Sequence, residues 1–337
     1  MAVSAYIRQQ PDRLAATLRD AAGMLAGWDP GPHDGLILVG SGSSMNALLA
    51  TRPAGREVQV TGPGAFLQAM RRGLDTRPLV VVMSQSGRSS TSVAAAEAAM
   101  VAGLPTLLIT AEAASPIAQL PLPRILLPIG PEPIGPKTKG FTASLGAMVA
   151  LGAHLAGLPV PQPDAAAMTA VVDGSAAPAA TLAATLDAAD YLLVTGHGHM
   201  FGIALEASLK IAEIAGLPTA AFEPEEALHG RLHGMTPQSL GLLIASNAAE
   251  LAESARIATA MAARGVRIRI LNLAGPPSHY DWCGGLAWPA SPLDIAAAII
   301  PFQWLAVALA ERRGMAPEAM RYPGLSADLA IKLPASP

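Results

Sequence analysis

The chain has 337 residues, of which 51% are hydrophobic and 14% charged, as expected for a compact protein of about two domains. Its net charge of -3 and pI near 6.2 argue against a nucleic-acid surface or an anionic membrane partner. The single cysteine, Cys283, excludes an internal disulfide and fits a reducing, cytoplasmic compartment.

No segment is expected to enter a membrane. Residues 1–13 carry Arg8 and Arg13 and lack the apolar core of a signal peptide. The most apolar stretch, 295–309, is short for a membrane span and contains Pro301. We therefore expect a buried helix there.

Two serine-rich loops in the first half each follow an apolar run. A Gly-Ser-Gly-Ser-Ser turn at 40–44 follows the run 36–39, and a Ser-Gln-Ser-Gly turn at 84–87 follows the run 79–83. Each pattern predicts a buried strand, a tight turn and then a helix. Backbone N–H groups and hydroxyls would converge at the positive end of a helix dipole, where a phosphate fits. One such loop is commonly structural, whereas two on neighbouring parallel strands predict a phosphate site.

The second half repeats the strand spacing of the first. Expected strands end at Gly40, Ser84, Thr110 and Pro128, and then at Gly196, Ser246, Asn272 and Pro289. Successive ends are 44, 26 and 18 residues apart in the first half, and 50, 26 and 17 in the second. Ala-rich helical stretches alternate with these short strands. The pattern predicts an α/β protein with two tandem, doubly wound parallel sheets, and ligands beyond the carboxyl ends of their strands.

This duplication predicts a division of the chain into five parts. The segment 1–20 is an N-terminal helical extension, 21–158 is the first sheet domain, and 180–315 is the second. The Pro- and Ala-rich stretch 159–179 is the expected joint between the domains. The remainder, 316–337, is a tail expected near the active site.

These features resemble the sugar isomerase (SIS) domain family in its tandem, flavodoxin-like form. Within that family the chain is similar to the isomerase domain of glucosamine-6-phosphate synthase and to stand-alone amino-sugar-phosphate deaminases and isomerases. The resemblance is carried by residues 42–44, 84–89, 130–142 and 205–213, and by His229, sixteen residues after Glu213. No counterpart of the synthase's glutaminase domain is found in the sequence.

The resemblance implies a sugar phosphate ligand and no cofactor. The family's phosphate-binding positions correspond to Ser43, Ser44, Ser84, Gln85, Ser86 and Ser89. Lys139 follows the loop that closes over the sugar in the family. It is expected to pair with the phosphate or with Glu132, or else to be a surface lysine.

Histidine pairs raise the question of a metal site. His229 and His233 are four residues apart, but the metalloprotease pattern has Glu where this chain has Gly230. His197 and His199 follow an expected strand and are interpreted as polar residues at the rim of the second sheet. No metal is expected.

Glu206, Lys210 and Glu213 share one face of an expected helix. Taken alone, this is the pattern of a solvated ion-pair stripe. The resemblance instead implies that Glu213 is the base that moves a proton between C1 and C2 of an opened sugar, and that Lys210 holds Glu206. It also implies a homodimer in which His229 reaches the neighbouring subunit's site and assists ring opening.

The sequence departs from the family at its tail and near the phosphate loop. Ala327 stands where the family has the lysine that meets the open-chain carbonyl, and Lys332 follows five residues later. Arg88 and Lys137 add positive charge where the family has acidic or small residues. The missing lysine puts imine-based ring opening in doubt.

Taken together, these features predict a cytoplasmic homodimeric enzyme of amino-sugar and carbohydrate-derivative metabolism. Its expected reaction is aldose–ketose isomerisation, deamination, or both, of a hexose phosphate or amino-hexose phosphate. The alternative is a non-catalytic phosphosugar sensor, which the residue at 327 favours. A purely structural scaffold would not need paired phosphate loops.

Overall fold

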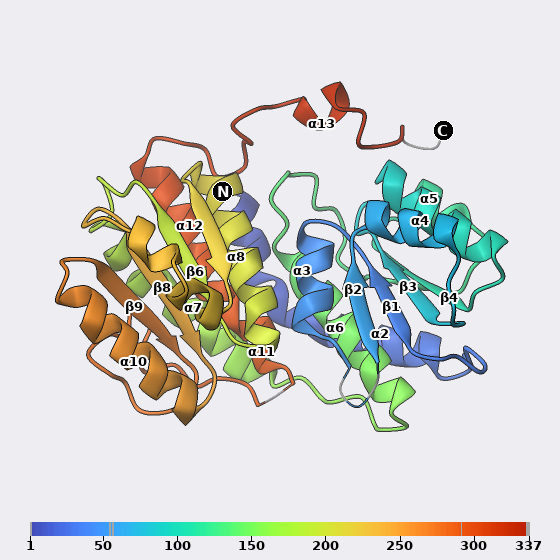
Figure 1. Ribbon diagram of the computed structural model, residues 1–337, viewed down its shortest axis with the longest axis horizontal. Helices are drawn as coiled ribbons and strands as arrows, with labels where there is room; N and C mark the ends of the chain where they lie inside the picture. Colours follow the sequence, from blue (N-terminus) through green and yellow to red (C-terminus); the bar gives the residue numbers. More distant parts are fainter. Residues whose placement is uncertain (1, 54, 56, 291, 335–337) are drawn as a thin grey trace. The chain divides into compact units, whose positions relative to one another are not determined.

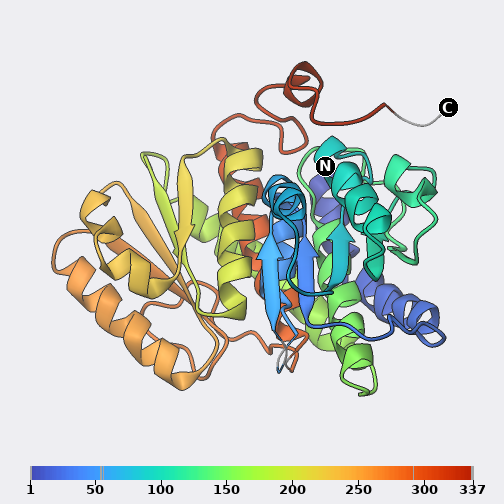
Figure 2. The same ribbon diagram turned by 45° about the vertical axis from the view of Figure 1, so that its right-hand side comes forward.

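The computed structural model describes residues 2–53, 55, 57–290 and 292–334 and divides the chain into two compact units. Unit 1 contains Met1–Pro11, Pro133–Thr138 and Asp164–Arg321. Unit 2 contains Asp12–Glu132, Lys139–Pro163 and Tyr322–Pro337. Each unit is an α/β structure with its own parallel sheet (Figures 1 and 2).

Unit 2 is built on five parallel strands in the order β2-β1-β3-β4-β5. The strands are β1 (Leu36–Val39), β2 (Val58–Thr61), β3 (Leu79–Met83), β4 (Thr106–Thr110) and β5 (Arg124–Leu126). The helices of unit 2 are most of α2 (Gln10–Leu25), α3 (Ser43–Ala50), α4 (Pro63–Arg72), α5 (Ser90–Val101), η1 (Pro116–Gln119), α6 (Lys139–Leu155) and α13 (Leu325–Asp328). Four of these strands match the apolar runs of the sequence; β2, at the sheet edge and only half-buried, was not predicted.

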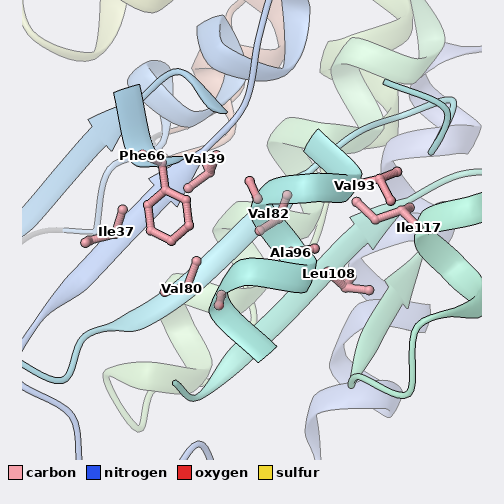
Figure 3. Close-up of a cluster of buried hydrophobic side chains, with 11 residues drawn as sticks. Ile37, Val39, Phe66, Val80, Val82, Val93, Ala96, Leu108 and Ile117 are labelled. Carbon is pink, nitrogen blue, oxygen red and sulfur yellow. The ribbon is translucent and has the colours of Figure 1, made fainter. Parts of the chain in front are cut away.

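The sheet of unit 2 is buried on both faces. Ile37 and Val80 point to one face and pack with Phe66 of α4 and with α5 (Figure 3). The intervening Leu38 and Val81 point to the opposite face and are also completely buried. Continuous apolar runs rather than alternating ones are therefore what this sheet requires.

Unit 1 is built on four parallel strands in the order β7-β6-β8-β9. The strands are β6 (Leu192–Thr195), β7 (Thr219–Phe222), β8 (Leu240–Ala245) and β9 (Arg267–Asn272). The helices are α1 (Ala2–Arg8), α7 (Ala165–Ala183), α8 (His199–Ala215), α9 (Pro224–Leu228), η2 (Arg231–Gly234), α10 (Ala248–Ala262), α11 (Asp294–Ala298) and α12 (Ile300–Arg312). Helix α10 lies on one side of this sheet and α8 on the other, with α12 packed against α7 and α8 (Figures 1 and 2).

One strand expected in the second half is absent from the described residues. No strand ends at Pro289: the segment before it is irregular, and the Trp288 Nε1–H donates to the Asn272 carbonyl at 3.1 Å. The stretch 159–179, expected to join the two domains, is helical from Ala165 onward, because alanine has the highest helix propensity and α7 packs against α12 despite the single proline inside it.

The apolar stretch at 295–309 forms most of α11 and most of α12 and is buried, as predicted. Among the described residues, the helical run Asp294–Arg312 has the length and composition of a membrane span. In the structure, 83% of its apolar window is buried, which is the environment of a core helix. Its polar residue Gln303 is also buried and accepts a hydrogen bond from Gln10 Nε2 at 2.7 Å.

Gly87 closes the turn between β3 and α5 in a left-handed conformation, with φ +60°. Its N–H donates to the Ser84 carbonyl at 2.9 Å, and its carbonyl accepts from the Ile117 N–H at 3.1 Å. A Cβ at this position would lie 2.0 Å from Ser115 Oγ. Both the backbone conformation and the lack of space therefore require glycine.

We expect Gly87→Ala to lower the free energy of unfolding by about 1–3 kcal/mol, measured by urea titration, because the backbone would be strained and Ser115 displaced. The control is Gly64→Ala in α4, where no atom lies within 4 Å of the added Cβ. That change should be neutral or slightly stabilising. Equal effects from the two substitutions would contradict the observed turn.

Candidate phosphate edge and carboxylate cluster

The two serine loops meet at one edge of the unit 2 sheet. Strands β1 and β3 are neighbours and parallel, with Val39 opposite Val82, so the loops 40–44 and 84–89 leave the sheet side by side. Each loop runs directly into a helix, α3 or α5. The N-termini of both helices thus face the same edge.

Four serine hydroxyls at this edge have no hydrogen-bond partner within the described part of the chain. They belong to Ser43, Ser44, Ser84 and Ser86. Each hydroxyl can donate one hydrogen bond and accept others. The edge therefore offers several donors that the protein itself does not use.

Ser89 has a different role, because its hydroxyl caps helix α5. Ser89 Oγ accepts from the Ser92 N–H at 3.4 Å and from Ser92 Oγ at 3.0 Å. With both acceptor positions used, its own proton is left to donate, either to Thr91 Oγ1 at 3.4 Å or to a ligand.

Gln85 is fixed by both its backbone and its side chain. Its carbonyl accepts from the Ala111 N–H at 2.9 Å, and its side-chain Nε2 donates to Glu132 Oε2 at 2.9 Å. The amide also lies against Gly140 at the start of α6, where a Cβ would come within 2.1 Å of Nε2. This side chain links the turn after β3 to the loop after β5.

Lys139 is buried at the first position of α6, so it is not a surface lysine. Burial lowers its pKa, the charge of Glu132 opposes that shift, and the charge of Arg13 adds to it. Of the possibilities left open by the sequence, pairing with Glu132 has structural support. Lys137, by contrast, donates to the Ile134 carbonyl at 2.9 Å.

In unit 1, helix α8 carries a buried cluster formed by Glu206, Lys210 and Glu213. Lys210 and Glu206 are completely buried, and their Nζ and Oε1 atoms lie 3.4 Å apart. Lys210 also donates to Glu213 Oε2, and the Glu213 side chain is 21% exposed. Burial alone lowers the pKa of Lys210, but the charges of Glu206 and then Glu213 outweigh it and raise the pKa above its ordinary value.

This burial distinguishes the cluster from a solvated stripe. Ion pairs on a surface cost little to form, whereas buried ones must compensate a large loss of hydration. Lys210 holds one oxygen of Glu213 in place, and the other oxygen has no hydrogen-bond partner among the described residues. The arrangement can accept a proton at Glu213 without movement of the helix.

His229 is on the surface of unit 1, with 70% of its side chain exposed. It ends α9, and its Nδ1 lies 2.8 Å from the Glu225 carbonyl oxygen. This contact holds Nδ1, and Nε2 has no hydrogen-bond partner among the described residues. An exposed imidazole of this kind is able to act on another molecule.

The corresponding edge of the unit 1 sheet already contains carboxylates. The Ser246 N–H and Oγ both donate to Glu250 Oε2 at 2.8 Å, and Asn247 Nδ2 donates to Oε1 at 2.8 Å. His197 Nε2 lies 2.6 Å from Glu253 Oε2. The donors that remain unused in unit 2 are satisfied internally here.

The two parallel sheets define the chain as an α/β protein. In open sheets of this class, ligands bind beyond the carboxyl ends of the strands. Residues 57–154 match the SIS domain family. This match confirms the resemblance to the SIS domain family within the first half of the chain, and the second SIS domain stays a prediction.

One relative is the glutamine–fructose-6-phosphate aminotransferase (isomerizing) of Acidithiobacillus ferridurans. It is 31% identical over 225 residues, which are 63% of this chain and 36% of the relative. The chain thus spans about a third of the length of that relative.

Solved structures show the same fold. A protein assigned as a phosphosugar isomerase from Clostridium difficile superposes with a TM-score of 0.83 at 18% identity, covering 98% of both chains. Tagatose-6-phosphate ketose/aldose isomerase from Escherichia coli gives 0.76 at 16% identity, covering 96% of this chain and 97% of the other.

The buried cluster makes a prediction for stability. Lys210→Met should lower the free energy of unfolding by about 3–5 kcal/mol at neutral pH, because it leaves buried carboxylates without a counter-charge. Arg313→Met, which removes an exposed cation from the same unit, should change it by less than about 0.5 kcal/mol. A Glu206→Gln/Lys210→Met double variant should recover part of the loss.

The same change gives a pH signature. Because the folded-state pKa of Lys210 is raised, its contribution is complete below the unfolded pKa of about 10.4 and disappears as the pH rises through the folded value. The difference in the free energy of unfolding between parent and Lys210→Met, measured by denaturant titration, should therefore narrow as the pH rises above about 10.4. A constant difference up to pH 12 would contradict the ion pairing.

Proposed function

We propose that the chain is a cytoplasmic phosphosugar enzyme, an aldose–ketose isomerase and/or deaminase of a hexose phosphate or amino-hexose phosphate. It consists of two tandem, doubly wound SIS domains, the first within 21–158 and the second within 180–315. It requires neither a metal nor a nucleotide cofactor. These assignments rest on the family match, on the names of the relatives and on the chemistry of the residues described above.

The observation that carries the proposal is the set of unused donors at the unit 2 edge. Serine hydroxyls from two loops lie at the N-termini of α3 and α5, where helix dipoles favour an anion. In this proposal a phosphate accepts from Ser43, Ser44, Ser84, Ser86 and Ser89, while Gln85 and Lys139 shape the adjoining loops.

Glu213 is the proposed base. In an opened sugar it removes the proton from the carbon next to the carbonyl, which gives an enediolate with its charge on the former carbonyl oxygen. The hydroxyl proton of the neighbouring carbon passes to that oxygen, and Glu213 returns a proton, exchangeable with solvent, to the former carbonyl carbon. The carbonyl thereby moves between C1 and C2 with no net gain or loss of atoms. Lys210 keeps the carboxylate oriented, and Glu206 keeps Lys210 in place.

The residue at 327 separates the possible reactions. Family members that carry a tail lysine there use it at the open-chain carbonyl, and this chain has Ala327. Isomerisation and hydrolytic deamination are therefore favoured over amination. The same alanine supports a second candidate function, a phosphosugar sensor that binds without turnover.

A thermal-shift screen of sugar phosphates identifies a ligand, since binding raises the stability of the folded state. With that ligand in D₂O, the parent protein should place deuterium at C1 or C2 of the sugar. Glu213→Gln should bind the ligand equally well, while its turnover falls by about 10²–10⁴-fold. Glu311→Gln, an exposed carboxylate of the same unit, is the control and should behave as the parent.

Normal turnover by Glu213→Gln would remove that residue from the proposed chemistry. Tight binding by the parent without label or product would instead support the sensor.

The proposed homodimer gives His229 a function, because its exposed ring would act in the partner subunit's site. Light scattering should give about twice the chain mass of 34.3 kDa. Glu213→Gln and His229→Ala should each be inactive alone, yet mixed dimers should regain one intact site and about a quarter of parental activity after random reassociation. A monomer in solution, or no recovery on mixing, would contradict this role.

A further inference from the structure

The C-terminal tail pairs with the phosphate loop of unit 2. The Ser90 N–H donates to the Ile331 carbonyl at 3.2 Å, and the Leu333 N–H donates to the Arg88 carbonyl at 2.7 Å. These two bonds form an isolated antiparallel bridge with Lys332 opposite Ser89. The tail thus adds a short strand to the turn between β3 and α5.

Side chains reinforce this pairing. Arg88 Nε donates to the Leu333 carbonyl at 2.8 Å, and Ser90 Oγ donates to the Ile331 carbonyl at 3.4 Å. Leu333 itself packs against the apolar cluster of Figure 3. The unusual arginine at position 88 therefore has a specific partner, which is the backbone of the tail.

The bridge determines where the Lys332 side chain points. The bonds flank Ser89 and Lys332 without joining them, so the two form a non-hydrogen-bonded antiparallel pair. In such a pair the side chains project to the same side, with Cβ atoms about 4.5–5.5 Å apart. Lys332 is exposed, and its ammonium has no partner among the described residues.

We propose that Lys332 supplies the cation of the phosphate site, at the side of Ser89. This inference rests on the proposed function and extends it to a residue of the tail. A phosphate monoester carries a charge of about -1.5 to -2 at pH 7, and the serine hydroxyls can donate to it without neutralising it. Lys139 is already close to Glu132, whereas the ammonium group of Lys332 has no partner among the described residues and belongs to a strand that pairs with the phosphate loop.

The position of Lys332 also indicates which end of the substrate it serves. It lies beside a serine of the phosphate loop, so its contact is with the phosphate rather than with the sugar carbonyl. Arg88 is then a positioning residue, because it holds the strand from which Lys332 projects. The site consequently favours a dianionic phosphate over a neutral sugar.

Titration calorimetry with inorganic phosphate and glucose 6-phosphate tests the proposal. Lys332→Ala should weaken both affinities by about tenfold at low salt, and Lys332→Arg should restore most of the loss. The difference between parent and Lys332→Ala should shrink in high salt, since an exposed charge is screened. Arg124→Ala removes a cation at the amino end of β5, away from this edge, and should leave both affinities unchanged.

Arg88→Ala tests the positioning role. It should weaken phosphate binding in the parent and have a much smaller effect in the Lys332→Ala background, because both changes act on one contact. Equal effects in the two backgrounds would mean that Arg88 acts on the phosphate directly.

A Ser86→Ala/Ser89→Val variant separates this inference from the proposed function. If that variant loses phosphate binding while Lys332→Ala binds as the parent does, the phosphate site stands and the role of Lys332 is wrong. If neither phosphate nor glucose 6-phosphate binds the parent, the proposed phosphate site fails, and the role of Lys332 fails with it.

Discussion

Both sheets share one constraint, which is that their first buried strand turns into a helix within a few residues. The first strand of each compact unit does so through glycine at the residue before the helix. Gly42 has φ 55° and ψ -132°, and Gly198 has φ 51° and ψ -114°. Two turns of nearly the same backbone conformation, 156 positions apart in the chain, are physical evidence for the duplication. Because the turn is so short, the N–H groups at the start of each helix face the carboxyl edge of its sheet.

What occupies that edge differs between the units. In unit 1 the carboxylate of Glu250 accepts from Ser246 and Asn247, so an internal anion already fills the position at the start of α10. In unit 2 the serines after β1 and β3 keep their donors for another group. Like charges repel at this range, so Glu250 disfavours a phosphate at the unit 1 edge. This difference supports a single phosphate site in the chain, in unit 2.

The sequence was sufficient wherever a feature depends on neighbouring residues. Apolar runs identified the central strands, and spacing alone placed Glu206, Lys210 and Glu213 on one helix face. Strands β2 and β7 were not predicted from the sequence because they are half-buried edge strands without a continuous apolar run. The burial of Lys139 and the pairing of Lys332 with Ser89 were also out of reach, since they depend on contacts between segments distant in sequence. No local pattern determines which loop a tail will meet.

The polar residues of the two units differ in charge. In unit 2, unused hydroxyls, two helix N-termini and the ammonium of Lys332 favour an anion. In unit 1, two carboxylates surround one buried ammonium, and the partly exposed Glu213 can accept a proton. A sugar phosphate has a dianion at one end and acidic C–H bonds beside a carbonyl at the other. Neither set of residues could perform the function of the other, because a carboxylate repels phosphate and an ammonium ion cannot remove a proton from carbon. The two units thus carry chemically distinct groups of residues, and the proposed function needs both, because phosphate binding and proton removal require opposite charges.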